Sequence, residues 1–249
     1  MTNNKMIFIA NWKMYGDKNN LKGLKEVLKF ERKKIDKKNT IIYCPPYTLL
    51  SDVSKILKNS NIKVGAQNCH HSYEYGPNTG CINVKLLKNV GAEYVIIGHS
   101  ENRFYDNDNI INKKLLAATK ENLKIIFCLG ETLKEKKSNK TFKVLKNQIR
   151  IGLKKIKNIN NVIIAYEPRW SIGTGNLPKK SELINNTNFI KKVIRSIDKK
   201  GKIKIIYGGS VNPSNISELC KIKLFNGFLI GSASLKHNNF IDIIKKTTI

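Results

Sequence analysis

The feature that most constrains this 249-residue sequence is a repeated alternation of short apolar runs with longer amphipathic segments. The apolar runs are continuous and rich in β-branched residues, as is typical of parallel strands that are buried on both faces. Eight such runs occur, at residues 6–11, 40–45, 62–67, 92–98, 123–130, 161–167, 202–209 and 225–231. Eight strand–helix units in about 250 residues predict an α/β fold, a single (β/α)8 barrel with a closed eight-stranded parallel sheet.

The segments between the runs place apolar residues on one face of a helix, which we expect to pack against the barrel. The clearest sets are Leu21, Leu24, Leu28 and Ile35 in one segment, and Phe142, Leu145, Ile149, Leu153 and Ile156 in another. An open doubly wound sheet is the alternative, and it fits less well because no Gly-x-Gly-x-x-Gly motif follows the first run. No linker interrupts the pattern, so one domain is predicted over residues 1–249.

The charge is strongly positive, with 46 Lys and Arg against 18 Asp and Glu and a net charge of +28. Such a balance is compatible with a nucleic acid or an anionic surface as partner. The basic residues are scattered from end to end, however, and no aromatic-interleaved RNA-binding motif or zinc-ligand pattern accompanies them. We therefore interpret the charge as solvated helix faces and expect no nucleic-acid partner.

The cysteines and the N-terminus indicate a cytoplasmic location. An odd number of cysteines is present without a Cys-x-x-Cys motif, which favours free thiols in a reducing compartment. They are Cys44, Cys69, Cys81, Cys128 and Cys220. The apolar run near the N-terminus is too short for a signal peptide, and no stretch is long enough to span a membrane.

Polar residues and glycines follow several of the predicted strands, at the end where barrels of this kind place their active sites. They are Asn11 and Lys13, His99 and Glu101, Glu167, the turn Gly208–Ser210, and the turn Gly231–Ser232. Each feature alone is weak evidence, because a lone histidine or glutamate after a strand is more often structural. Their coincidence on one rim predicts an active site.

These residue types favour acid–base chemistry on a small phosphorylated molecule. Backbone N–H groups of the glycine-rich turns can hold a phosphate. Glu167 can act as a base, and Lys13 can neutralise negative charge that develops on oxygen. His99 opens a segment that can begin a helix, with Ser100 as a candidate cap. An imidazole that faces helix-start N–H groups is disfavoured as a cation, so a neutral His99 is expected to donate a hydrogen bond.

Six motifs in order resemble the triosephosphate isomerase family: NWKMYG (11–16), IIGHSENR (96–103), CLGET (128–132), AYEPRWSIGTG (165–175), YGGSV (207–211) and LIGSASL (229–235). The resemblance covers essentially the whole chain, and that family has the (β/α)8, or TIM, barrel fold. It implies interconversion of dihydroxyacetone phosphate and glyceraldehyde 3-phosphate through an enediolate, in glycolysis and gluconeogenesis. It implies neither a cofactor nor a metal.

The resemblance also implies a role for each site residue. Glu167 is the base, neutral His99 moves protons between the oxygens, and Lys13 with Asn11 stabilises negative charge, with Glu101 as a partner near Lys13. Both Asn11 and Lys13 also bind substrate. The phosphate is held by N–H groups of Gly173, Ser210, Gly231 and Ser232. The segment after Glu167 forms a lid, in which Pro168 stiffens one end, Trp170 packs, and Gly173 and Gly175 permit backbone movement.

The loop 68–83 is expected, by the same resemblance, to enter a second subunit and to bring Thr79 near the partner's active site in a homodimer. Relatives commonly carry a carboxylate at position 81 and an arginine at position 102, which pair across the interface. Here these positions are Cys81 and Asn102. Because both partners of the pair are absent together, we expect the dimer to survive.

Two further departures concern the site itself. Ser232 replaces the glycine that relatives usually carry, and a positive φ there would cost about 1 kcal/mol or more, so somewhat weaker substrate binding is expected. Arg169 replaces an apolar residue at the lid hinge, and the resemblance does not explain it.

Two other functions remain open at this point. A metal-dependent epimerase on a similar barrel would need His and Asp ligands at strand ends. The pair His70–His71 lies in a loop, and adjacent histidines point apart in an extended chain. A basic barrel that binds nucleic acid would place no demand on Glu167.

Overall fold

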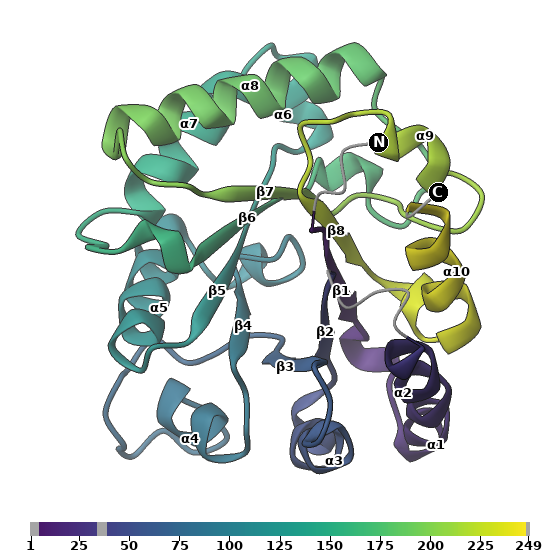
Figure 1. Ribbon diagram of the computed structural model, residues 1–249. Coiled ribbons are helices and arrows are strands. Elements are labelled where there is room, and N and C mark those ends of the chain that lie inside the picture. Colours follow the sequence, from purple (N-terminus) through teal and green to yellow (C-terminus); the bar gives the residue numbers. More distant parts are fainter. Residues whose placement is uncertain (1–4, 34–38, 248–249) are drawn as a thin grey trace.

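The fold is a closed barrel of eight parallel strands in chain order, with helices on its outside (Figure 1). This computed structural model describes residues 5–33 and 39–247. The strands are β1 (Ile7–Asn11), β2 (Thr40–Cys44), β3 (Lys63–Ala66), β4 (Tyr94–Ile97), β5 (Lys124–Leu129), β6 (Val162–Tyr166), β7 (Lys204–Tyr207) and β8 (Gly227–Ile230). Each lies within one of the eight predicted runs, so the barrel prediction is confirmed.

Helices connect the strands. The α-helices are α1 (Lys18–Lys22), α2 (Leu24–Arg32), α3 (Tyr47–Leu57), α4 (Val84–Asn89), α5 (Asp108–Lys120), α6 (Leu133–Lys137), α7 (Thr141–Gly152), α8 (Lys180–Ile197), α9 (Ile216–Cys220) and α10 (His237–Thr247). Short 3₁₀ helices are η1 (Lys13–Tyr15), η2 (Asn102–Phe104), η3 (Ile159–Asn161), η4 (Arg169–Ser171) and η5 (Ser232–Ser234). Among the described residues, no helix is both long and apolar enough to span a bilayer.

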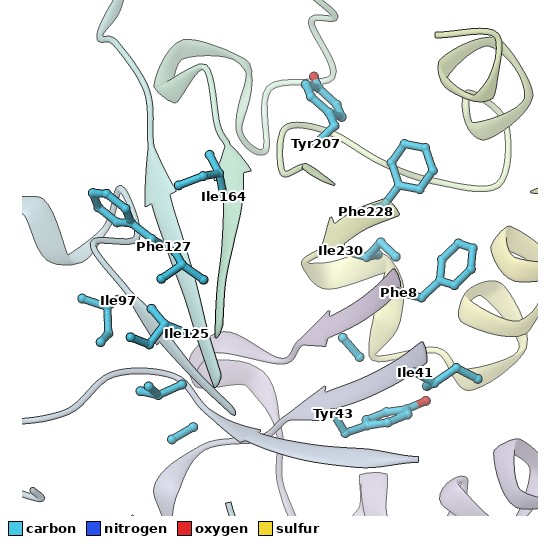
Figure 2. Close-up of a cluster of buried hydrophobic side chains, with 14 of the residues drawn as sticks. Phe8, Ile41, Tyr43, Ile97, Ile125, Phe127, Ile164, Tyr207, Phe228 and Ile230 are labelled. Carbon is cyan, nitrogen blue, oxygen red and sulfur yellow. The ribbon is translucent and has the colours of Figure 1, made fainter. Parts of the chain in front are cut away.

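The strand side chains divide into two apolar layers, because successive residues of a strand point to opposite faces. One set, which includes Ile9, Ile126 and Leu229, forms a cluster of its own. The other set packs together with the helices, and Figure 2 shows some of its members, among them Phe8 and Phe228. Burial on both faces explains why the sequence runs are continuously apolar.

The first amphipathic segment breaks into two helices at Gly23, between the end of α1 at Lys22 and the start of α2 at Leu24. A Cβ atom at position 23 would lie 2.0 Å from the His237 ring, so this close approach requires glycine. The break changes the buried face. Leu24 is buried as predicted, whereas Leu21 and Leu28 are half-buried and pack at the edge of the core. The predicted position Ile35 lies outside the described residues.

The α7 segment buries Leu145, Ile149 and Leu153, as predicted. The prediction for Phe142 is wrong, because its side chain is 46% exposed. Its ring stacks instead on Phe189 of α8, with 4.3 Å between the ring centroids. Ile156 follows the end of α7 and is half-buried against the core.

Polar contacts made by two side chains, His237 and Lys114, tie helices to neighbouring parts of the fold. The His237 ring of α10 places Nε2 2.8 Å from the Asn20 carbonyl and Nδ1 3.4 Å from the Tyr43 hydroxyl, and burial lowers the pKa of His237. On the other side of the fold, the Lys114 ammonium is buried 2.5 Å from Asp106. A buried charge needs such a partner.

Candidate active site

The carboxyl ends of the strands bring the predicted site residues to one rim. A cavity of about 70 Å³ there is lined by Asn11, Lys13, His99, Gly173, Ser210, Gly231 and Ser232, among others. Glu167 and Glu101 do not line this cavity but contact residues that do. Glu167 lies 3.7 Å from His99, and Glu101 lies 2.6 Å from Lys13.

Glu167 follows β6 directly and is only 1% exposed. Its backbone N–H donates to the Leu129 carbonyl at 2.8 Å, which fixes the chain where the strand ends. One carboxylate oxygen, Oε2, lies 3.5 Å from the Ser100 N–H. The other, Oε1, is buried without a hydrogen-bond partner among the described residues. A buried acceptor of this kind is costly to leave unsatisfied, so a proton donor bound in the site would be favoured there.

His99 is buried, and its Nδ1 atom accepts a hydrogen bond from the Glu101 backbone N–H at 3.3 Å. An amide can only donate, so Nδ1 carries no proton and the neutral ring carries its proton on Nε2. The Glu101 carboxylate is also 3.5 Å from Nδ1, which is beyond the usual length of an N–H···O hydrogen bond. The arrangement fits the neutral donor expected from the sequence.

The helix start expected after His99 is formed, but differently from the prediction. The short helix η2 begins at Asn102, its cap position is Glu101, and no side chain caps it. Ser100 is therefore not a cap. Its backbone N–H faces Glu167 instead.

Lys13 has a left-handed backbone, with φ 51°, which the sequence did not predict. This conformation costs a non-glycine residue about 1 kcal/mol or more. Two side chains hold the strained residue: Asn11 accepts from its N–H at 3.1 Å, and Gln67 donates to its carbonyl at 2.9 Å. Sequence reasoning missed Gln67, which ends a predicted strand run and could have been found from its place on the rim.

Ser232 begins η5, and its φ is not positive. The backbone strain expected from a serine at this position is therefore absent. Because a serine fits here without penalty, the expectation of weaker substrate binding on that ground is withdrawn. The turn after β7, at residues 208–210, lies across the same cavity.

The segment after Glu167 forms η4 and then a loop in which Gly173 and Gly175 have positive φ, 69° and 75°. Trp170 packs as predicted, with the Lys136 ammonium 3.7 Å from its ring centroid. Its indole N–H donates to Glu131 at 3.0 Å. The segment after Glu167 is thus fixed near its start by the hydrogen bond of Trp170, and it contains two glycines with positive φ further along.

Glu131 is a site residue that sequence reasoning missed. It is buried, burial raises its pKa, and it accepts hydrogen bonds from Trp170 and from the Tyr166 hydroxyl, the latter at 3.3 Å. The signal was present, since Glu131 lies two residues beyond the end of β5, close to the place that Glu167 takes after β6.

The His70 and His71 rings lie 4.2 Å apart, so the expectation that they point apart is wrong. The chain bends at His71 and is not extended there. Across residues 5–33 and 39–247, no group of three or more His, Cys, Asp or Glu side chains could hold a metal ion.

Several large apolar side chains are exposed close to the site in sequence. Met14, next to Lys13, is 96% exposed, and Phe104 and Tyr105, just beyond Glu101, are also exposed. Thr79 and Cys81 in the loop 68–83 are exposed as well. Exposed apolar groups of this size commonly mark an interaction surface.

Comparison with known proteins agrees with these features. The family model described as triosephosphate isomerase matches residues 6–247. A triosephosphate isomerase of Thermodesulfovibrio yellowstonii is 40% identical over 250 residues, which cover 97% of this chain and 99% of the relative. One from Bartonella henselae is 42% identical over 248 residues, covering 98% and 97%. The crystal structure of triosephosphate isomerase from Bartonella henselae superposes with a TM-score of 0.88 at 39% identity, covering 97% of this chain and 98% of that one.

Proposed function

The chain belongs to the triosephosphate isomerase family, and on that premise we propose how its residues carry out the reaction. It is an isomerase that interconverts dihydroxyacetone phosphate and D-glyceraldehyde 3-phosphate, a reaction of glycolysis and gluconeogenesis. The reaction moves a proton between adjacent carbons. The substrate carbonyl accepts the electron pair, so the proposed mechanism uses neither a cofactor nor a metal.

Glu167 is the proposed base, and its unpartnered buried Oε1 atom is the observation that carries the proposal. This oxygen lies 3.7 Å from His99 Nε2, so a substrate bound against both side chains would meet the base and the proton donor together. The carboxylate takes the proton from the carbon beside the carbonyl and returns it to the neighbouring carbon.

Neutral His99 donates from Nε2 to the substrate oxygens and moves protons between them. Lys13, assisted by Asn11, stabilises the negative charge of the enediolate. Lys13 is also the partner of Glu101, at 2.6 Å. Its strained backbone, held by two side chains, supports a positioning function.

The phosphate is held by backbone N–H groups of Gly173, Ser210 and the Gly231–Ser232 turn, which line one cavity. Because Gly173 belongs to the segment after Glu167, binding the phosphate couples this segment to the substrate. A closed segment excludes water, which would otherwise promote loss of phosphate from the enediolate.

The active form is proposed to be a homodimer, in which the loop 68–83 carries Thr79 toward the partner's Lys13. The exposed Met14, Phe104 and Tyr105 support this surface as the interface. Cys81 and Asn102 are both uncharged, so no buried charge is left unpaired there. Sedimentation at micromolar concentration is expected to give the mass of a dimer, and a monomer would contradict the proposal.

The barrel extends from β1 to α10, which supports one domain over residues 1–249. A cytoplasmic location is proposed from the five free thiols.

The mechanism is tested by running the reaction in heavy water and following the carbon-bound hydrogens by NMR. Proton abstraction by Glu167 exposes the proton to solvent, so deuterium is expected at the carbon that receives it. The Glu167→Gln variant should show neither turnover nor exchange. Rapid isomerisation by the wild type without deuterium uptake would indicate direct hydride transfer and contradict a base.

A further inference from the structure

Arg169 is the residue of the site that the proposed mechanism leaves unexplained. It begins η4, and its backbone N–H donates to the Glu131 carbonyl at 3.0 Å. Its side chain is half-buried, yet within residues 5–33 and 39–247 its guanidinium makes no ion pair or hydrogen bond. The five N–H groups of a guanidinium normally find acceptors, so this one is free to pair when an acceptor comes within reach.

The surroundings of Arg169 show what such a partner could be. A cavity of about 480 Å³ lies beside the substrate cavity, and Ile172 lines both. Among the described residues that line the larger cavity, Arg169 is the only basic one and Glu101 the only acidic one. Arg169 does not line the substrate cavity, so it has no direct contact with the place where substrate binds.

The counterion of Glu101 is Lys13, which also takes part in the proposed reaction. Its carboxylate is 2.6 Å from the Lys13 ammonium, and its side chain is 56% exposed. When substrate binds, the same ammonium must turn to the substrate oxygen that becomes negative. Glu101 would then stand without a counterion beside a growing negative charge, and this repulsion opposes the reaction.

We propose that Arg169 is a positioning residue that replaces Lys13 as the counterion of Glu101 when Lys13 turns to the substrate. The guanidinium crosses the cavity that both residues line and pairs with the carboxylate. It is suited to this exchange, because it stays charged and matches the two oxygens of a carboxylate. Lys13 is thereby released to the enediolate. This inference rests on the proposed function, since it concerns the same reaction.

The test is a double-mutant cycle on kcat/KM with Arg169→Leu and Glu101→Gln. Arg169→Leu is expected to lower kcat/KM by about three-fold, the size of effect typical of a partly exposed charge pair. The same substitution should have no effect in the Glu101→Gln background, because no carboxylate remains to be neutralised. Arg169→Lys should restore part of the loss.

Two controls separate the pairing of Arg169 with Glu101 from a general loss of positive charge and from damage to the lid segment. Lys134→Leu removes a positive charge from an exposed site next to Leu133, which lines the same cavity, and should leave kcat/KM unchanged. Inhibition by inorganic phosphate probes the phosphate cavity, and its constant should be unchanged in Arg169→Leu. A changed constant would show that the substitution has disturbed the segment that carries Gly173, and would overturn the assignment.

The outcomes distinguish this inference from the proposed function. Wild-type protein without isomerase turnover would overturn the function itself. If the wild type is active and Arg169→Leu lowers kcat/KM equally in the wild-type and Glu101→Gln backgrounds, Arg169 attracts the anionic substrate at long range. That result would overturn the pairing with Glu101. Active wild type with no loss at all would overturn it as well.

Discussion

Replacing Gly208 with alanine should disable the base while leaving the fold intact. A Cβ atom at position 208 would lie 2.7 Å from Cγ of Glu167 and 3.0 Å from its Oε1. Ordinary van der Waals contacts begin at 3.4 Å, whereas the new Cβ would lie 2.7 Å from Glu167 Cγ. The Glu167 side chain must therefore withdraw by about 0.7 Å, the difference between these two distances. Because misplacement of a reacting group by about 1 Å can cost 10²-fold in rate, a displacement of about 0.7 Å should lower kcat by roughly 25-fold.

The Gly208→Ala variant should lose about 1–3 kcal/mol of stability, because the added methyl group overpacks the buried Glu167 side chain and the shift is confined to that one residue. A coupled assay gives kcat, and urea unfolding gives the free energy. In the Glu167→Gln background the added methyl group should cost little further activity, since both changes act on the same carboxylate. Full activity of the single variant would refute the placement of Glu167.

Three further variants test other parts of the structure. Lys114→Met leaves Asp106 buried without its partner, so unfolding should become easier by about 3 kcal/mol, and Asp106→Asn added to it should recover part of this loss in urea unfolding. Burial lowers the pKa of His237 from 6.5, so the unfolded chain binds the proton more readily; stability should be complete above pH 6.5 and decline as the pH falls below it. His237→Gln should remove that part of the decline in thermal melts at several pH values, and an unchanged pH dependence would contradict it. Trp170→Phe removes the donor to Glu131, and a hydrogen bond to a charged group contributes ~1.5–3 kcal/mol, so kcat/KM should fall by roughly 10- to 150-fold; an unaltered value would show that this contact does not hold the lid segment.

The barrel could be predicted because its sequence pattern repeats eight times and follows directly from the burial of the strands. Strands buried on both faces must be continuously apolar, and eight of them leave few alternatives. The faces of individual helices were less predictable. One segment breaks at Gly23, where His237 leaves no room for a side chain, and the exposed Phe142 stacks on Phe189 rather than on the barrel. Both outcomes depend on residues far away in the sequence.

The site could be predicted as far as its residue types at the strand ends. The sequence pattern does not reveal the backbone conformation of each residue or the contacts between residues far apart in the chain. The contact of the left-handed Lys13 with Gln67 arises only when the segments that follow β1 and β3 meet at the rim. The expected strain at Ser232 is absent, because Ser232 begins a 3₁₀ helix without a positive φ. Glu131 shows the reverse case, since its position after β5 was readable but its role depends on Trp170.

The central claim is that Glu167 performs the proton transfer. The most direct measurement is a coupled isomerase assay of the wild type beside Glu167→Asp, which keeps the carboxylate but shortens the side chain by one methylene group. We expect turnover by the wild type and a kcat lower by two orders of magnitude or more in the variant, since the charge is kept and only its position changes. A Glu167→Asp variant as active as the wild type would show that another group removes the proton.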